Sequence, residues 1–214
     1  MFIVWKYSSF CCKRVTLVPE PLIALQSHSA IKQFTRDCLQ NNTSYKECVH
    51  AVQQKFPFLK HIRWSVHPFN SILEVELYKP LAIINSQSIF TENNNIFDIS
   101  LFTEQYREHI PEVSVEPGLF STLLPIISKV VYILPPEYSD LFRIDVVNKH
   151  TITLRDIHDE HYALVCLPEQ KISESVIYTY NSIKNNLAQT MVGNKKISYV
   201  VDIRFAHYII AYKA

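Results

Sequence analysis

The chain contains only two glycines among its 214 residues, Gly118 and Gly193. Glycine-rich loops that wrap phosphate groups need several glycines at fixed spacing, because their backbone approaches the ligand closely. A nucleotide site of that type is therefore excluded. The G-x-S-x-G motif of serine hydrolases is also absent.

A long apolar run and an excess of charge of one sign are missing too. A membrane-spanning helix needs about 20 apolar residues, and no such window occurs; Met1–Trp5 is apolar, but Lys6 interrupts it. The 21 Lys and Arg residues nearly balance the 20 Asp and Glu residues, and the net charge is +1. This balance argues against a surface for nucleic acid, which would carry clustered Lys and Arg.

The five cysteines show no C-x-x-C or Cys/His spacing, so we expect no zinc site. Cys38 and Cys48 fall on the apolar stripes of two successive expected helices. They either pack as small buried hydrophobes, which we favour, or form a disulfide in an oxidising compartment. Because the number of cysteines is odd, at least one thiol stays free or pairs between chains.

The clearest local pattern is an amphipathic hairpin that follows Pro57, a residue that ends a helix. Residues 62–67 alternate apolar and polar side chains, as do residues 73–78, and turn residues 68–71 lie between the two runs. Both runs are therefore predicted to be half-buried strands. We expect Trp64 and Val75 to face the helices that cover this hairpin.

Two helices are predicted upstream of the hairpin. Ser44 and Glu47 form a capping box, and apolar residues follow at helical spacing through Phe56. An earlier apolar stripe begins near Ile31, with Ser29 as the expected N-cap. A short strand at 14–18 completes the order strand, helix, helix, strand, strand.

The remainder of the chain, after Pro80, alternates apolar runs with polar turns. We expect helices at 101–109, 119–131 and 172–187, antiparallel strands at 142–147, 151–155 and 162–167, and a closing hairpin at about 198–213.

Two segments carry a family resemblance. The helix that runs into "FPFLKHIRWSVHPFNSILEVELYKPLAII" resembles a POTRA module and, more narrowly, the FtsQ/DivIB family of bacterial cell-division proteins. The C-terminal "VVDIRFAHYIIAY" resembles the closing hairpin of that family, in which an Asp-Leu-Arg-aromatic strand precedes a final apolar strand. The resemblance covers about 14–214 and departs at the closing turn, where Ala206 and His207 stand instead of a glycine.

The resemblance implies an α+β fold with two domains: an N-terminal POTRA-like β-α-α-β-β module at 14–80, followed by an antiparallel β domain with flanking helices at 81–214. The family has an N-terminal membrane helix, so 1–13 would be a remnant of that anchor. We expect either a truncated chain, a misassigned start or a lost anchor. The implied location is the bacterial inner membrane, with the bulk of the chain extracytoplasmic.

The implied function is a non-catalytic scaffold of the divisome that binds the small proteins FtsB and FtsL. Since the last strand is a natural sheet edge, a partner strand would add to it by β-augmentation. In the family, the Arg and the aromatic of the Asp-x-Arg strand and an aromatic near the end of the final strand contact FtsB. The expected partner-binding residues here are Ile203, Arg204, Phe205, Tyr208, Ile210 and Tyr212. The alternative is that Phe205 belongs to the core and Arg204 is a solvated charge.

Two other functions remain open from the sequence. The chain could be a POTRA-type chaperone or docking module of a secretion or outer-membrane assembly system, although repeated POTRA units are not present in it. An enzyme would need a site, and the only histidine-rich segment, 156–161, has the composition of a solvated turn. We therefore expect no catalytic residue, no metal, no cofactor, no small-molecule substrate and no nucleic-acid partner.

Overall fold

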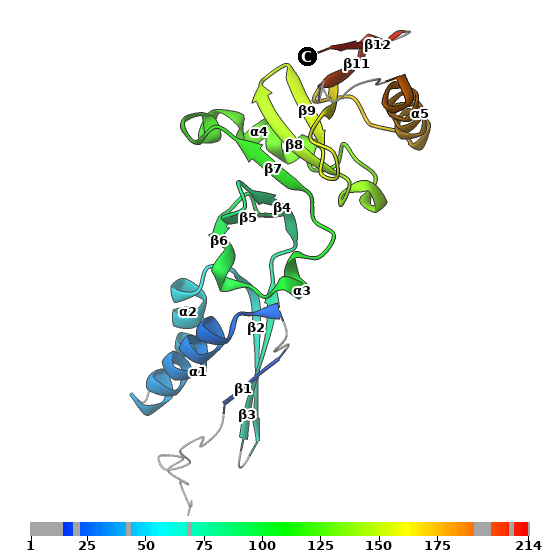
Figure 1. The fold of residues 1–214 in the computed structure, drawn as a ribbon. Coiled ribbons are helices and arrows are strands. Elements are labelled where there is room, and N and C mark those ends of the chain that lie inside the picture. The colour runs from blue at the N-terminus through cyan, green and yellow to red at the C-terminus, as the bar shows by residue number, and fades with distance from the viewer. Residues whose placement is uncertain are drawn as a thin grey trace, which may run out of the picture. The chain divides into compact units, whose positions relative to one another are not determined.

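The computed structural model describes residues 15–18, 22–41, 44–67, 70–190, 198–205 and 208–213, so the segment 1–13 lies outside the described residues. Over this part of the chain the fold is α+β, with a three-stranded sheet and a nine-stranded mixed sheet (Figure 1). The chain divides into two compact units. The first consists of Met1–Pro80 with Phe97–Glu108, and the second of Leu81–Ile96 with His109–Ala214.

The first unit has the predicted order of strand, helix, helix, strand, strand. Its elements are β1 (Val15–Val18), α1 (Leu25–Gln40), α2 (Tyr45–Lys55), β2 (Leu59–His67) and β3 (Asn70–Leu77). The central strand is β3, which pairs antiparallel with β2 and parallel with β1. The alternation of the hairpin is confirmed: Ile62, Leu73 and Val75 are buried, and the intervening Arg63 and Glu74 form an ion pair on the other face.

The two helices of the first unit begin in different ways. The capping box at α2 is confirmed, because the Glu47 backbone N–H donates to Ser44 Oγ and the Ser44 N–H donates to the Glu47 carboxylate. The predicted N-cap at Ser29 is wrong, because α1 begins four residues earlier, after Ala24. Since the Ala24 N–H donates to the Leu101 carbonyl at 3.0 Å, a tertiary contact accompanies this helix start in place of a side-chain cap.

The Leu101 carbonyl belongs to a segment that the sequence analysis assigns to the second domain. Only α3 (Glu104–Arg107) is an α-helix there, so the prediction of a helix over 101–109 is wrong in length. Aromatic packing explains why the segment joins the first unit. Phe102 packs edge-on against Phe58 of the first unit and stacks on Tyr106, with ring centroids 5.6 and 4.4 Å apart.

The second unit contains the nine-stranded sheet, in the order β12-β11-β10-β9-β8-β7-β4-β5-β6, except that most of β6 falls in the first unit. The strands are β4 (Pro80–Ile84), β5 (Ser88–Thr91), β6 (Ile96–Asp98), β7 (Glu112–Val115), β8 (Phe142–Asn148), β9 (Thr151–Asp156), β10 (Tyr162–Cys166), β11 (Tyr199–Phe205) and β12 (Tyr208–Lys213). Two helices, α4 (Phe120–Val130) and α5 (Glu174–Thr190), connect strands of this sheet.

The expectation of an antiparallel β domain is wrong, because the large sheet is mixed. Strands β8, β9 and β10 are antiparallel as predicted, but β4–β7, β7–β8 and β10–β11 are parallel pairs. The connections explain the difference. A helix between two strands returns the chain to the same end of the sheet, and α4 links β7 to β8 while α5 links β10 to β11.

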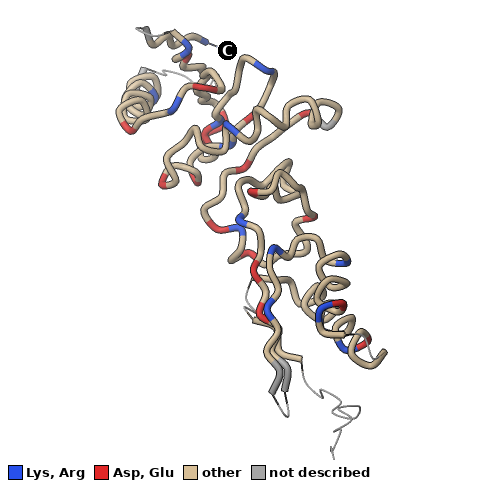
Figure 2. The backbone as a smooth tube through the Cα atoms, turned by 180° about the vertical axis from the view of Figure 1, so that it is seen from behind, with Lys and Arg blue, Asp and Glu red and all other residues tan. Residues whose placement is uncertain are grey.

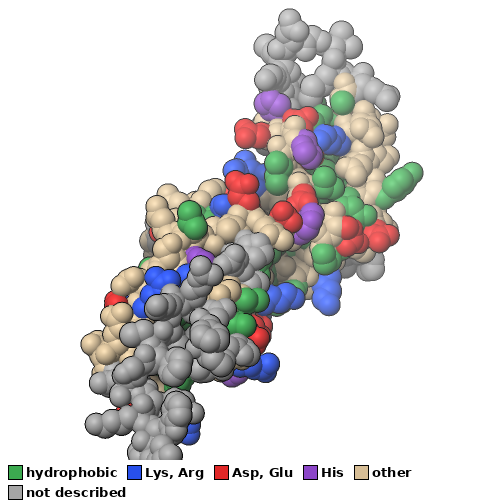
Figure 3. Space-filling model, turned by 90° about the horizontal axis from the view of Figure 1, so that it is seen from below, with side chains coloured by type: hydrophobic (Ala, Val, Ile, Leu, Met, Phe, Trp, Pro, Cys, Tyr) green, Lys and Arg blue, Asp and Glu red, His purple; other side chains and the backbone are tan. Residues whose placement is uncertain are grey.

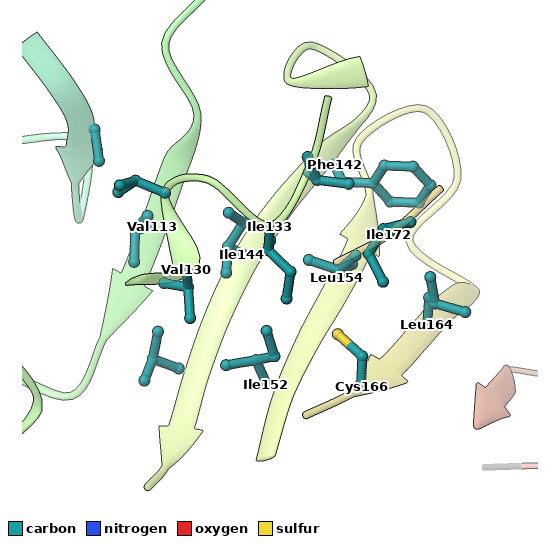
Figure 4. Close-up of a cluster of buried hydrophobic side chains, with 14 of the residues drawn as sticks. Val113, Val130, Ile133, Phe142, Ile144, Ile152, Leu154, Leu164, Cys166 and Ile172 are labelled. Carbon is teal, nitrogen blue, oxygen red and sulfur yellow. The ribbon is translucent and has the colours of Figure 1, made fainter. Parts of the chain in front are cut away.

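The core of the second unit lies on the face of the sheet that α4 and α5 cover. Figure 4 shows part of this core, the buried side chains on the central strands. Alternate residues of the central strands point into it, as a strand of period 2 requires. These residues include Val113, Ile144, Ile152, Leu154 and Leu164. The opposite face of the sheet is here called the outer face.

Because glycine is scarce, other residues occupy the left-handed positions of the turns. Left-handed backbone conformations are taken by Asn85, Ser86, Asn94 and His109, although such positions usually favour glycine or asparagine. At the β4–β5 turn the Asn85 side chain donates to the Val115 carbonyl and accepts from the Val115 N–H, both at 2.8 Å. The turn is thereby tied to the end of β7.

Candidate partner-binding edge

Strand β12 ends the large sheet. Its antiparallel partner is β11, and no described strand pairs with its other side. In Figure 1 it lies at the margin of the sheet, next to the C-terminus. In an antiparallel pair every second residue points its N–H and C=O groups away from the neighbouring strand. The outer side of β12 therefore carries backbone groups that a further strand can pair with.

The side chains of β12 are exposed on both faces. The exposed fractions of Ile209, Ile210 and Tyr212 are 43, 45 and 44%. Such a run of large apolar residues is unusual at an edge strand, which proteins normally protect with charge or proline. Within β12 the only charged residue is Lys213.

Strand register places two of these residues on the outer face of the sheet. Tyr212 pairs with Val200, and Ile210 pairs with Asp202. The pair that lies between them, Val201 with Ala211, belongs to the opposite face, because Val201 is in the core. Side chains of Ile210 and Tyr212 thus stand side by side on one face of the edge strand.

The closing hairpin is confirmed, and β11 contains an irregularity ahead of its turn. Asp202 pairs with Ile210 and Phe205 with Tyr208, so three steps along β11 match two along β12. This is a β-bulge between Asp202 and Phe205. The turn residues Ala206 and His207 lie outside the described residues.

Arg204 is held by its own strand. Its Nη2 donates to Asp202 Oδ2 at 2.6 Å, its Nε donates to both carboxylate oxygens, and its backbone N–H donates to Oδ1 at 3.1 Å. The hydrogen bonds from Arg204 lower the pKa of Asp202, whose side chain is buried. Within the described residues these bonds use Nε and Nη2, so Nη1 carries further donors for a partner.

The Asp202–Arg204 pair is expected to make stability depend on pH. Because the pKa of Asp202 is lowered from 3.8, its contribution is fully present above that value and is lost as the pH falls through the lowered native pKa. In the Arg204→Gln variant the pKa of Asp202 is lowered less, so less stability should be lost at low pH. The measurement is the difference between the urea midpoints of wild type and variant, from about pH 6 to about pH 2. A difference that stays constant over that range would contradict the linkage.

The other predicted site residues divide into two groups. Phe205 is 50% exposed, so it is a surface residue, whereas Ile203 is 3% exposed and belongs to the core. The backbone carbonyl of Ile203 accepts a hydrogen bond from Gln170 Nε2 at 2.8 Å. Tyr208 starts β12, but its side chain lies outside what the structure describes. The exposed members of the predicted set are therefore Phe205, Ile210 and Tyr212, with Arg204 half-buried.

Sequence reasoning missed two buried residues that lie on the outer face beside the edge. Val165 pairs with Asp202 and Ala163 pairs with Val200, so both lie on the outer face of the sheet. The available signal was that β10 reads as five consecutive apolar residues, which is typical of a strand covered on both faces. Both side chains are 8% exposed, so they are buried and add no accessible area to the edge strand.

The histidine-rich turn at 156–161 is organised by the buried carboxylate of Asp156. Asp156 Oδ1 accepts the backbone N–H groups of His158 and Asp159. Its Oδ2 accepts from Lys184 Nζ at 2.6 Å and from the Tyr180 hydroxyl at 3.2 Å. Burial, followed by the nearby Asp156 charge, raises the pKa of Tyr180. Asp156 thus fastens α5 to the end of β9.

Over the described residues, positive and negative side chains do not separate into large patches of one sign. Lys and Arg are scattered among Asp and Glu over the described backbone (Figure 2), and on the face in Figure 3 both signs are interspersed with hydrophobic side chains. Within the described residues, no group of three or more His, Cys, Asp or Glu is arranged to hold a metal ion. The helices described in the structure include none with the length and hydropathy to span a bilayer.

Comparison with protein-family models and with curated proteins gives no match for this chain.

Proposed function

We propose that this chain is a non-catalytic scaffold that captures a strand of a partner protein at β12. The observation that carries the proposal is the edge strand itself: it ends the large sheet and exposes Ile209, Ile210 and Tyr212. A partner strand would bind by main-chain hydrogen bonds, which supply affinity, while the exposed side chains supply specificity.

The family resemblance gives the partner. We propose that the chain acts in the bacterial divisome as an FtsQ/DivIB-type protein, with its extracytoplasmic domain binding FtsB- and FtsL-like proteins to control septum formation. An N-terminal anchor in the inner membrane would hold it there. Support comes from the β-α-α-β-β order of the first unit and from the Asp-x-Arg strand that precedes the edge.

The side chains at the edge suit a partner strand that is amphipathic and carries an acidic residue. Tyr212 and Phe205 would be aromatic anchors, the residue types that dominate interface energies. Arg204 would present Nη1 to a partner carboxylate while Asp202 holds the rest of the guanidinium in place. This arrangement positions Arg204 before the partner arrives and reduces the entropy lost on binding.

The test is a titration with the soluble part of the cognate FtsB protein. Tyr212→Glu places a charge on the apolar edge and is expected to weaken binding at least about tenfold. Tyr178→Glu is the matched control, because Tyr178 is an exposed tyrosine on α5. It should bind like wild type, and both variants should keep the wild-type circular dichroism spectrum and melting midpoint.

Hydrogen exchange distinguishes strand addition from side-chain docking. Amides on the outer side of β12 should exchange quickly in the free protein and become protected in the complex. Unchanged exchange in β12, or wild-type affinity of a folded Tyr212→Glu protein, would overturn the edge-strand proposal.

A further inference from the structure

The first unit contains two cysteines on facing helices. Cys48 of α2 is fully buried, and its thiol lies 4.0 Å from the Thr35 carbonyl oxygen of α1. Cys38 follows Thr35 by three residues, so it lies on the same side of α1 as that contact. Cys38 lies close enough to Cys48 to contribute to the raised pKa of the Cys48 thiol, and both thiols are free in the structure.

The two thiols differ in access. Cys38 is half-buried, whereas Cys48 is enclosed between the helices. Burial, with a smaller effect of Cys38, raises the pKa of Cys48 to about 12. A thiol of that kind reacts slowly with reagents in solution, because the thiolate is the nucleophile. An external reagent therefore meets Cys38 first.

We propose that Cys38 and Cys48 are a redox-sensitive pair, in which Cys38 is the entry thiol and Cys48 the resolving thiol of a disulfide that joins α1 to α2. This goes beyond the proposed function, because it concerns the first unit and involves no partner at β12. The described cysteine that remains, Cys166, is buried in the second unit and takes no part.

The reaction is a thiol–disulfide exchange with a small disulfide such as oxidised glutathione. The Cys38 thiolate attacks one sulfur of the reagent, which leaves a mixed disulfide and releases one glutathione thiolate. The Cys48 sulfur then attacks the Cys38 sulfur, and the Cys48 proton passes to the second glutathione, which leaves as a thiol. Two electrons pass from the cysteine pair to the reagent, and the bridge links residues 38 and 48.

The experiment uses the full chain with Cys11→Ser and Cys12→Ser, so that any bridge involves the described cysteines. After incubation with oxidised glutathione, mass spectrometry should show a loss of about 2 Da, without an adduct. A peptide map should connect Cys38 to Cys48, and Cys166 should be alkylated only after unfolding. The oxidised protein should melt at least about 5 °C higher than the reduced protein.

Single variants test the assigned roles. Cys48→Ala should retain one glutathione on Cys38, because the resolving thiol is missing. Cys38→Ala should remain unmodified, because Cys48 is inaccessible. Failure of the bridge to form at Cys38 and Cys48, a bridge between chains, or equal modification of the two single variants would overturn the proposal. None of these outcomes depends on partner binding at β12.

Discussion

Lys184→Met is expected to destabilise the second unit by about 3 kcal/mol, because it leaves the Asp156 carboxylate buried with its charge uncompensated. In the native protein, Lys184 Nζ lies 2.6 Å from Asp156 Oδ2, and both side chains are more than three-quarters buried. The same ammonium lies 5.4 Å from the centroid of the Tyr162 ring. Methionine is unbranched and one heavy atom shorter than lysine, so the main change is the loss of the charge and the donors.

Urea unfolding followed by far-UV circular dichroism measures this loss. The control is Lys171→Met, which makes the same chemical change at an exposed position and should alter stability by less than about 0.5 kcal/mol. Tyr180→Phe removes one hydrogen bond to the same carboxylate and should cost about 1 kcal/mol. If Lys184→Met behaved like Lys171→Met, the network around Asp156 would not fasten α5.

Trp64→Ala is expected to destabilise the first unit by about 3 kcal/mol, at the lower end for a large aromatic because the side chain is half-buried. Trp64 packs edge-on against Tyr45 of α2, with ring centroids 4.7 Å apart. This contact joins β2 to the helical layer. Val75, in the adjacent strand, is buried, so the prediction that both residues face the helices is confirmed.

A second substitution, Trp64→Phe, separates the contribution of the aromatic ring from that of the indole N–H. Trp64 Nε1 is buried without a hydrogen-bond partner among the described residues, and an unsatisfied donor costs about 1–3 kcal/mol. Trp64→Phe keeps an aromatic ring against Tyr45 and removes that donor, so it should cost much less than Trp64→Ala. Equal losses for the two variants, measured by chemical denaturation, would show that the Tyr45 contact contributes nothing.

The elements that could be predicted are those whose pattern is local. The capping box at Ser44 and the alternation of the hairpin from 62 to 78 depend on neighbouring residues alone, and both are confirmed. The start of α1 could not be predicted, because it depends on the Leu101 carbonyl, far away in the sequence. The parallel pairs of the large sheet were missed because periodicity gives strands but not their direction.

At the candidate edge, too, the local features could be predicted and those that depend on distant residues could not. Its exposed apolar residues follow from the alternation in the last strand, whereas the bulge in β11 appears only in the structure. The burial of Ile203 and the capture of Arg204 by Asp202 depend on which face of β11 meets the core. That choice is made by the pairing of β11 with β10, which no pattern within β11 reveals.

The parallel pairing of β10 with β11 has a consequence for the order of assembly. The chain leaves the sheet at Cys166 and returns at Tyr199 by way of α5, so this pairing closes a long loop, whereas β11 and β12 are adjacent in sequence. Long-range pairing is the slower event, since loop-closure entropy opposes it. The hairpin joins the sheet only when the crossover is complete, and capture of a partner strand at β12 would therefore select chains whose second unit has finished folding.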